Sequence, residues 1–294
     1  MLAVIERFHV YPEIDPFKHF AEKSFKDKII LITGASHGIG KQYAITYAQA
    51  GASLVISACN VKALDDVKQE DLRVSPATEN VSVVADVADV KQVETFVKAG
   101  VERFGKLDIV IGNARMFIDC DAPLGEQDPV ARWAVFEVNL RSVHSLSYFT
   151  LPHLVKVEGY FVAISSLSGM MRVSNGSSYR VSKHAVNRFI EFVALEYPTI
   201  KAFAIHPGVI ATDANAQTDF PPVHEMGLPT ATTIYLTSGN ADWLSGRFIF
   251  APWDLGEVRD QWKEKIEKEA GLVSKLFIPA YLTTRLCGLD ISLS

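Results

Sequence analysis

Short apolar runs, rich in β-branched residues, alternate along this chain with longer stretches of helical periodicity. The apolar runs predict seven buried strands, at residues 28–33, 53–57, 81–85, 107–111, 160–165, 201–205 and 247–251. The clearest helical stretches are residues 38–50, 91–104, 130–151, 178–197 and 255–270. Strands that alternate with helices form parallel sheets covered on both faces. We therefore predict an α/β fold, a single doubly wound Rossmann-type domain with a seven-stranded parallel sheet.

The same pattern divides the chain into three parts. Residues 1–27 precede the first strand and are expected to form an N-terminal arm, residues 28–270 form the domain, and residues 271–294 form a C-terminal tail. We expect the apolar tail to pack on the domain or on a second subunit. Residues 207–229 interrupt the alternation of strands and helices, and Pro221, Pro222 and Gly227 lie among them. Long loops in compact domains are often functional, so we predict that this segment is a substrate lid.

Composition narrows the class of protein. A chain of 294 residues that is 48% hydrophobic can bury a large core, and a net charge of −5 argues against nucleic acid or an anionic membrane surface as partner. We expect a small-molecule ligand. Cys59, Cys120 and Cys287 show no Cys-x-x-Cys spacing, which argues against disulfides and structural zinc, and we find no other metal constellation. The N-terminus lacks a signal-peptide pattern and no run reaches about 18 uninterrupted apolar residues, so we predict a cytoplasmic protein without a membrane span.

A glycine-rich segment directly follows the first predicted strand and opens a helix. It reads Thr-Gly-Ala-Ser-His-Gly-Ile-Gly over residues 33–40. Glycines permit a tight turn there and let the backbone approach a pyrophosphate, whose charge is stabilised at the helix N-terminus. We therefore predict a dinucleotide-binding loop that uses Gly34, Ser36, His37, Gly38, Ile39 and Gly40.

Tyr179 and Lys183 lie four residues apart on a predicted helix, so their side chains share one face. A tyrosine needs help to act as an acid or base near neutral pH, and a nearby ammonium lowers its pKa by stabilising the phenolate. Ser166 lies thirteen positions upstream at the end of a strand, where its hydroxyl can hold a substrate oxygen near the phenol. A second Tyr-x-x-x-Lys match begins at Tyr197, but Pro198 ends the helix there, and we do not assign it a role.

Together these motifs resemble the classical short-chain dehydrogenase/reductase family. The Gly-x-x-x-Gly-x-Gly spacing of the loop, the serine and the Tyr-x-x-x-Lys pair occur in the family's order, and the likeness runs from about Lys28 to Asp254. The arm before the first strand and the ending Trp253-Asp254-Leu255 also resemble, more weakly, a fungal secondary-metabolism subgroup.

The resemblance implies a catalytic tetrad of Ser166, Tyr179, Lys183 and Asn139. In reduction, Ser166 and Tyr179 polarise a carbonyl, the nicotinamide delivers hydride and Tyr179 gives the proton, and oxidation reverses these steps. Lys183 lowers the tyrosine pKa and binds the nicotinamide ribose. Asn139 supports a water-mediated proton relay to the lysine, although a solvated asparagine on a helix face is the alternative.

The resemblance also extends the cofactor site beyond the glycine loop, Tyr179 and Lys183. It adds Asp86, Val87, Asn113, Ala114, Pro207, Ile210 and Thr212. After the second strand the chain reads Ser-Ala-Cys-Asn over residues 57–60, with neither the acid that favours NAD nor an arginine for a 2′-phosphate. We favour NADP(H), because no acid repels a phosphate there and His37 could meet it, and keep NAD(H) as the alternative.

Arg115 departs from the family, which has glycine at this position. It could distort the turn after the fourth strand, or it could point into the site and contact an anionic substrate.

We therefore predict that residues 28–270 form the dinucleotide-binding catalytic domain of an NAD(P)(H)-dependent oxidoreductase that interconverts an alcohol and a ketone or aldehyde. Apolar residues near the expected crevice and lid indicate an apolar substrate: Met116, Phe117, Met170, Met171 and Phe220. The family implies a homodimer or homotetramer. Two alternatives stay open, a redox-neutral isomerase, epimerase or cyclase that uses the same site, and a cofactor-binding regulatory protein.

Overall fold

One sheet of seven strands forms the centre of the protein in the computed structural model, which describes residues 3–118, 122–212 and 221–275. Its strands are β1 (Ile29–Thr33), β2 (Ser53–Ala58), β3 (Asn80–Val84), β4 (Ile109–Gly112), β5 (Tyr160–Ile164), β6 (Lys201–His206) and β7 (Arg247–Phe250). All neighbouring strands are parallel, in the order β3-β2-β1-β4-β5-β6-β7. The predicted α/β fold with a seven-stranded parallel sheet is confirmed.

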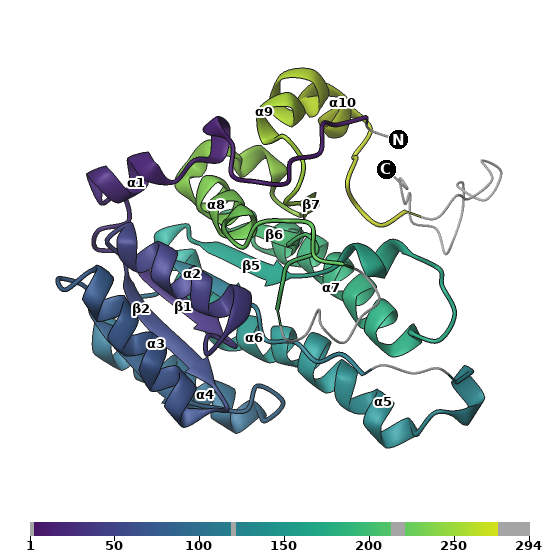
Figure 1. Ribbon diagram of the computed structural model, residues 1–294, viewed down its shortest axis with the longest axis horizontal. Coiled ribbons are helices and arrows are strands. Elements are labelled where there is room, and N and C mark those ends of the chain that lie inside the picture. The colour runs from purple at the N-terminus through teal and green to yellow at the C-terminus, as the bar shows by residue number, and fades with distance from the viewer. Residues whose placement is uncertain (1–2, 119–121, 213–220, 276–294) are drawn as a thin grey trace, which may run out of the picture.

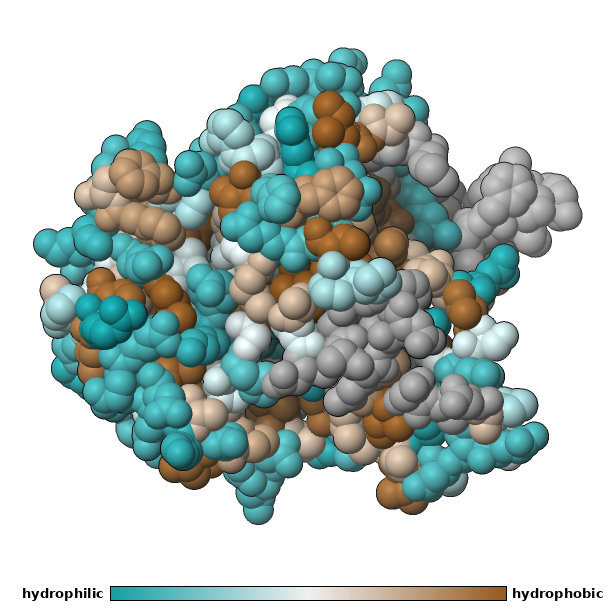
Figure 2. Space-filling model, in the orientation of Figure 1, coloured by the Kyte–Doolittle hydropathy of each residue, from teal (hydrophilic) through white to brown (hydrophobic). Residues whose placement is uncertain are grey.

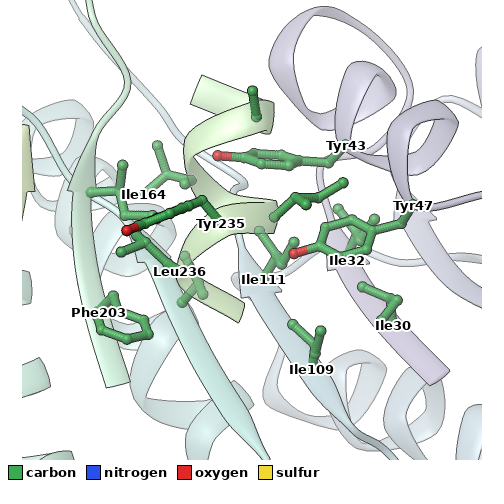
Figure 3. Close-up of a cluster of buried hydrophobic side chains, with 14 of the residues drawn as sticks. Ile30, Ile32, Tyr43, Tyr47, Ile109, Ile111, Ile164, Phe203, Tyr235 and Leu236 are labelled. Atoms are coloured by element: carbon green, nitrogen blue, oxygen red, sulfur yellow. The ribbon is translucent and has the colours of Figure 1, made fainter. Parts of the chain in front are cut away.

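Helices cover both faces of this sheet (Figure 1). One face packs against α2 (Gly38–Gln49), α3 (Val61–Val74) and α8 (Gly227–Tyr235), and the other against α4 (Val90–Phe104), α6 (Ser142–Leu154) and α7 (Ser177–Glu196). Successive side chains of β1 alternate between the two cores, with Ile30 and Ile32 on the α2 side and Ile29 and Leu31 on the other. Figure 3 shows the first core, in which the tyrosines of α2 lie over the isoleucines of β1 and β4.

Two helices that we predicted as continuous are interrupted. Residues 130–151 divide into α5 (Pro129–Phe136) and α6, joined by the π-helical turn Glu137–Arg141. Residues 255–270 divide into α9 (Leu255–Glu257), the π-helical turn Val258–Trp262 and α10 (Lys263–Lys268). A single π-helical turn changes the spacing of apolar positions too little to be recognised from periodicity.

Two further helices, α3 and α8, were not among the clearest predictions. The only apolar side chains that α3 buries are those of Leu64 and Val67, so its apolar face is narrow. α8 is rich in threonine, which has low helix propensity, yet nearly all of it is buried. Thr233 satisfies its hydroxyl inside the helix by donating to the carbonyl oxygen of Pro229 at 2.8 Å.

The N-terminal arm packs along the domain beside α8, α9 and α10 (Figure 1). It contains the short helix α1 (Phe17–Glu22) and buries Tyr11, Ile14 and Phe25 in the same core as α2. The ring of Phe25 meets the ring of Tyr47 edge-on, with 5.2 Å between their centres. The arm therefore shares the core that lies between the sheet and α2.

Hydrophilic and apolar side chains are mixed on the surface that Figure 2 shows. In the orientation of Figure 1, hydrophilic side chains predominate along the edge formed by α3 and α4, with apolar side chains in small groups (Figure 2). Among the helices of residues 3–118, 122–212 and 221–275, none combines the length and apolar character needed to span a bilayer.

Candidate active site

The order of strands reverses its direction at β1. This strand pairs with β2 on one side and with β4 on the other, so the chain winds away from β1 in both directions. In open parallel sheets, ligands bind outside the carboxyl ends of the strands at such a switch point. The glycine loop follows β1, Asn113 follows β4 and Ser166 follows β5, so these predicted site residues share one edge of the sheet.

The turn after β1 needs glycine at three positions. Gly34 and Gly38 have φ values of +64° and +54°, in the left-handed region that other residues rarely adopt. At Gly40, a Cβ atom would lie 2.1 Å from the carbonyl oxygen of Gly34 and 2.5 Å from Nδ2 of Asn113. The turn therefore packs directly on the start of α2, and the space that a side chain would fill is taken by backbone.

The first N–H groups of α2 have no partner within the helix, as at any helix N-terminus. His37 is the N-cap residue, but its side chain makes no hydrogen bond to these amides. Its Nδ1 instead lies 2.9 Å from Oγ of the buried Ser36, and the ring itself is exposed. Free amides at the positive end of a helix, beside a glycine turn, fit the pyrophosphate of a dinucleotide.

Asn113 ties the turn after β4 to the turn after β1. Its Nδ2 donates to the carbonyl oxygens of Thr33 at 3.0 Å and Gly34 at 3.1 Å. The backbone N–H groups of Asn113 and Ala114 both lie 3.1 Å from Oγ1 of Thr33 and donate to it. These bonds explain why an asparagine is needed here: its side chain fixes the shape of the glycine turn.

Arg115 leaves this turn intact. Its φ is not in the positive region, and its neighbours keep their hydrogen bonds, from Ala114 to Thr33 and from Met116 to Asn139. The Arg115 side chain is exposed and makes no hydrogen bond or ion pair with the residues that the structure describes. The first of the two interpretations, a distorted turn, is therefore wrong.

Helix α7 brings Tyr179 and Lys183 together. Nζ of Lys183 lies 5.8 Å from the centre of the Tyr179 ring and donates a 2.7 Å hydrogen bond to the carbonyl oxygen of Ile164, the last residue of β5. The ring of Phe117 meets the Tyr179 ring edge-on, with 5.3 Å between their centres. Lys183 is fully buried, whereas Tyr179 is half-buried. The Tyr179 ring, which α7 carries, thus packs against the loop after β4.

Burial and, to a smaller extent, the positive charge of Arg115 together lower the pKa of Lys183 from its ordinary 10.5 to about 7. No carboxylate in the described part of the chain pairs with this ammonium. Lys183 therefore changes its charge near neutral pH, where a group that assists proton transfer is most useful.

Ser166 begins the short 3-10 turn Leu167–Met170 just beyond β5. Its Oγ accepts a hydrogen bond of 3.1 Å from the backbone N–H of Ser168 and keeps its own hydrogen to donate. Ser165 differs, because its hydroxyl is buried and donates to Oδ1 of Asn187 at 2.5 Å. The hydrogen bonding therefore favours Ser166 over Ser165 as the serine that contacts substrate.

Asn139 lies in the π-helical turn between α5 and α6 and is fully buried, so the alternative of a solvated helix-face asparagine is wrong. Its Oδ1 accepts from the N–H of Met116 at 2.8 Å, and its Nδ2 donates to the Met116 carbonyl oxygen at 2.9 Å and to Oγ of Ser182 at 3.1 Å. Asn139 thus fixes the backbone of the loop after β4 against α7. Single π-helical turns are frequent at functional sites.

Asp86, Val87, Cys59 and Asn60 follow the carboxyl ends of β2 and β3, at the same edge of the sheet as the glycine loop. Asp86 is exposed and accepts a 2.9 Å hydrogen bond from the N–H of Ala88, while Val87 is buried. Asn60 caps α3 through its Oδ1, so that oxygen is already engaged. Cys59 is an exposed free thiol whose pKa is raised by partial burial and by the charge of Asp86.

The segment after β6 closes the site from the side of the glycine loop. A Cβ atom on Gly38 would lie 3.2 Å from Cγ2 of Thr212, so the Thr212 side chain lies against the glycine turn. Pro207 is half-buried and Ile210 is buried, in an isolated parallel bridge with His224. Phe220 lies outside the described residues, as do its neighbours 213–219.

This arrangement, a glycine turn at a helix N-terminus beside a tyrosine and a lysine, defines a nucleotide-binding oxidoreductase of the α/β class. A profile of the short chain dehydrogenase family matches residues 28–220. A short chain dehydrogenase of Monascus purpureus is 33% identical over 266 residues, which are 85% of this chain and 89% of that protein. The cyclohexanol dehydrogenase of an Acinetobacter strain is 30% identical over 76% of this chain and 92% of its own.

Solved structures agree with this assignment. A levodione reductase superposes with a TM-score of 0.71 at 27% identity, over 77% of this chain and 96% of that chain. A 7α-hydroxysteroid dehydrogenase, complexed with NADH and 7-oxoglycochenodeoxycholic acid, gives a TM-score of 0.73 at 25% identity, over 79% and 96% of the two chains. The protein belongs to the short-chain dehydrogenase family and is an NAD(P)-dependent oxidoreductase that acts on alcohols and ketones.

Proposed function

We propose that Tyr179 is the acid/base of this enzyme, assisted by Lys183 and Ser166. The observation that carries the proposal is the position of the Lys183 ammonium, 5.8 Å from the centre of the Tyr179 ring on the same face of α7. When Lys183 is charged, it stabilises the phenolate and so lowers the pKa of the tyrosine. Ser166 lies at the end of β5, the strand whose last carbonyl holds Lys183, and its hydroxyl hydrogen is available to a substrate oxygen.

In the proposed reduction, Ser166 and Tyr179 donate hydrogen bonds to the carbonyl oxygen of the substrate, and Tyr179 transfers its proton to that oxygen. In oxidation, Tyr179 accepts the proton of the alcohol. A bound nicotinamide cofactor supplies or accepts the hydride. Asn139 holds the loop after β4 through both backbone groups of Met116, which keeps Phe117 against the ring of Tyr179.

The glycine turn and the amides of α2 are proposed to bind the pyrophosphate, with Gly34, Gly38 and Gly40 shaping the turn. Asp86 and Val87 are the proposed contacts of the adenine end of the cofactor. Ile210 and Thr212 are the proposed contacts of the nicotinamide end, and they lie with Pro207 on the segment after β6.

NADP(H) is the proposed cofactor, because β2 is followed by Cys59 and Asn60 and not by an acid. His37 can meet a phosphate, since its Nε2 has no partner in the described part of the chain. Titration with NADPH and NADH tests this preference. We expect NADPH to bind more tightly to the wild type and Cys59→Asp to reverse the order by placing an acid there. Tighter binding of NADH to the wild type would contradict it.

An apolar alcohol or ketone is the proposed substrate. Met116, Phe117 and Met171 are half-buried beside the loop after β4 and the turn after β5, and Met170 is exposed next to them. The similar cyclohexanol and 7α-hydroxysteroid dehydrogenases are named for alicyclic alcohols. Arg115 offers a contact for an anionic substituent, because its guanidinium is exposed and unpaired within the described residues.

A panel of ketones and alcohols, read at the nicotinamide absorbance, tests the substrate class. We expect turnover of alicyclic ketones with bulky apolar rings and faster turnover of a keto acid than of its methyl ester. Activity confined to small polar sugars would contradict the apolar substrate. A redox-neutral isomerase would convert substrate without any change in that absorbance, so the same assay separates the two reactions.

A homodimer or homotetramer remains our proposal for the assembly. Val130 and Trp133 on α5 and Tyr148 on α6 are exposed apolar side chains in the structure of the single chain. Light scattering on the purified protein measures the mass directly, and a monomer would contradict the proposal. The cytosolic location predicted from the sequence also stays a prediction.

A further inference from the structure

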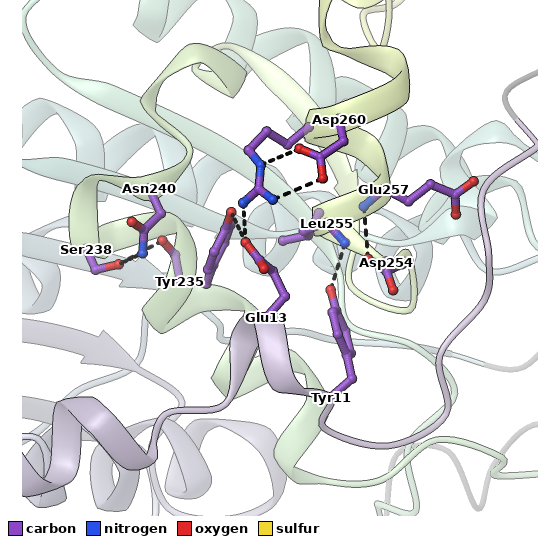
Figure 4. A network of polar contacts seen from close by, with 10 residues as sticks. Tyr11, Glu13, Tyr235, Ser238, Asn240, Asp254, Leu255, Glu257 and Asp260 are labelled. Atoms are coloured by element: carbon purple, nitrogen blue, oxygen red, sulfur yellow. Dashed lines mark hydrogen bonds and ion pairs between the residues drawn. The ribbon is translucent and has the colours of Figure 1, made fainter.

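The N-terminal arm is fixed to the chain after β7 by a series of polar contacts (Figure 4). Glu6 and Trp253 form an antiparallel bridge, and the guanidinium of Arg7 lies 2.5 Å from the carboxylate of Asp254. The hydroxyl of Tyr11 donates to the Trp253 carbonyl oxygen at 3.0 Å and accepts from the N–H of Leu255 at 2.8 Å. Further along, Glu13 pairs with Arg259 and accepts from the hydroxyl of Tyr235. These contacts hold residues 5–13 in one position.

This fixed arm lies against His224, which follows the segment 207–223. The ring of Phe8 stacks on the His224 ring, with 5.3 Å between the centres and 10° between the planes. Oε1 of Glu6 lies 3.3 Å from Nε2 of His224. The N–H of Glu225 donates to the Phe8 carbonyl oxygen at 2.9 Å. Phe8 therefore covers one face of the imidazole, and Glu6 contacts its Nε2 atom.

The inner nitrogen of His224 holds the backbone that follows β6. Its Nδ1 accepts a 3.0 Å hydrogen bond from the N–H of Val209, and the N–H of His224 donates to the Val209 carbonyl oxygen at 3.1 Å. A Cβ atom on Gly208 would lie 3.1 Å from the imidazole, so the ring fits closely under this turn. His224 is itself buried.

One tautomer satisfies both contacts of the ring. Because Nδ1 accepts from Val209, the proton must be on Nε2, which donates to Glu6. The arm thus selects the tautomer that can hold Val209. In metal sites, a hydrogen bond to the second ring nitrogen fixes the tautomer and orientation of a histidine in the same way.

We propose that His224 is a positioning residue for residues 207–212. Glu6 and Phe8 of the arm hold the His224 ring in the orientation in which its Nδ1 accepts from Val209. The inference rests on the proposed function, in which Ile210 and Thr212 bind the nicotinamide end of the cofactor. It assigns the arm a role in cofactor binding, although no residue of the arm has to touch the cofactor.

The sharpest test replaces Phe8, which is exposed and lies outside the catalytic machinery. Phe8→Ala removes the ring that covers His224, and Glu6→Gln weakens the contact to Nε2. Phe17→Ala is the matched control, because Phe17 is an arm phenylalanine that is 72% exposed, against 44% for Phe8, and does not stack on His224. His224→Asn keeps an acceptor near Val209, and His224→Leu removes it.

Two measurements are made on the full-length protein. Hydrogen exchange of peptides covering residues 207–212, without cofactor, reports the bond from Val209 to His224. Fluorescence titration with NADPH reports cofactor affinity. We expect faster exchange and about 3- to 10-fold weaker binding in Phe8→Ala, a larger effect in His224→Leu, partial rescue in His224→Asn and no change in Phe17→Ala.

Unchanged exchange in Phe8→Ala and His224→Leu would overturn the inference, as would faster exchange with unaltered NADPH affinity. Loss of affinity in Phe17→Ala to the same extent would also overturn it, because it would indicate a general effect of the arm on stability. Turnover by the wild type decides the proposed function separately. If the wild type bound no cofactor, the role in cofactor binding would fall, and the exchange data would still decide whether the arm holds Val209.

Discussion

Nζ of Lys183 donates its hydrogen bond to the carbonyl oxygen of Ile164 at 2.7 Å. The bond joins the middle of α7 to the end of β5, the strand that also delivers Ser166. A single carbonyl replaces only part of the hydration that an ammonium loses on burial, which is why burial is the main cause of the lowered pKa of Lys183. The site therefore holds a group that is useful for catalysis and unfavourable for folding.

Lys183→Met is expected to stabilise the protein, by on the order of 1–2 kcal/mol, while abolishing turnover. The folded pKa of about 7 lies below the ordinary 10.5, so the unfolded wild type binds more protons between these values and its stability rises with pH there. The advantage of the variant should be largest below pH 7 and shrink towards pH 10. Denaturant unfolding at three pH values measures the difference in the free energy of unfolding between Lys183→Met and the wild type, and Lys201→Met is the control. An advantage that grows with pH would contradict this account.

Arg115→Met is expected to move the pH profile of kcat/KM. The charge of Arg115 helps to lower the pKa of Lys183, so its removal raises that pKa and keeps the ammonium charged to higher pH. The loss of activity on the alkaline side should therefore begin at higher pH than in the wild type. Arg115→Lys, which keeps the charge, should leave the profile unchanged. Identical profiles for all three proteins would show that Arg115 does not act on Lys183.

Ser166→Ala is expected to lower kcat by about 100-fold or more, because it removes a donor to the substrate oxygen. Ser168→Ala is the control in the same turn, since Ser168 contributes its backbone N–H to the contact with Ser166 and not its hydroxyl. Both variants should bind NADPH as the wild type does. Steady-state kinetics with one ketone compares them, and equal losses in the two variants would remove Ser166 from the mechanism.

Gly40→Ala is expected to destabilise the protein by about 3 kcal/mol or more and to abolish cofactor binding. The added methyl group would meet the Gly34 carbonyl oxygen at 2.1 Å, and neither that backbone nor the Asn113 amide can move without opening the turn. Gly125→Ala is the control, because a Cβ atom there has nothing within 4 Å. Thermal unfolding and NADPH titration measure both effects. Normal binding by Gly40→Ala would refute the assigned role of the turn.

The sequence allowed the sheet and much of the candidate site to be predicted because both depend on local patterns. Strands buried on both faces appear as apolar runs, and the glycine turn and the pair Tyr179 and Lys183 each lie within a few residues of one another. The second match, Tyr197 and Lys201, fails for an equally local reason: α7 ends at Glu196 and β6 begins at Lys201.

What the sequence did not reveal depends on contacts between distant segments. His224 has no recognisable motif, and its partners, residues 6, 8 and 209, are distant in the sequence. Asn139 was identified, but its position in a π-helical turn and its contacts with Met116 could not be seen from helical periodicity. Nothing in the sequence indicated that the arm packs on the domain, because its polar residues pair with residues near Asp254, which lies 247 positions after Arg7 in the sequence.

The most direct test of the central claim compares wild type with Tyr179→Phe for NADPH binding and for turnover of one ketone substrate. Phenylalanine keeps the ring that packs on Phe117 and removes only the hydroxyl. We predict wild-type affinity for NADPH and a loss of kcat of about 1000-fold or more, because the proton donor is gone. Turnover within a few-fold of the wild type, with NADPH bound normally, would contradict the assignment of Tyr179 as the acid/base.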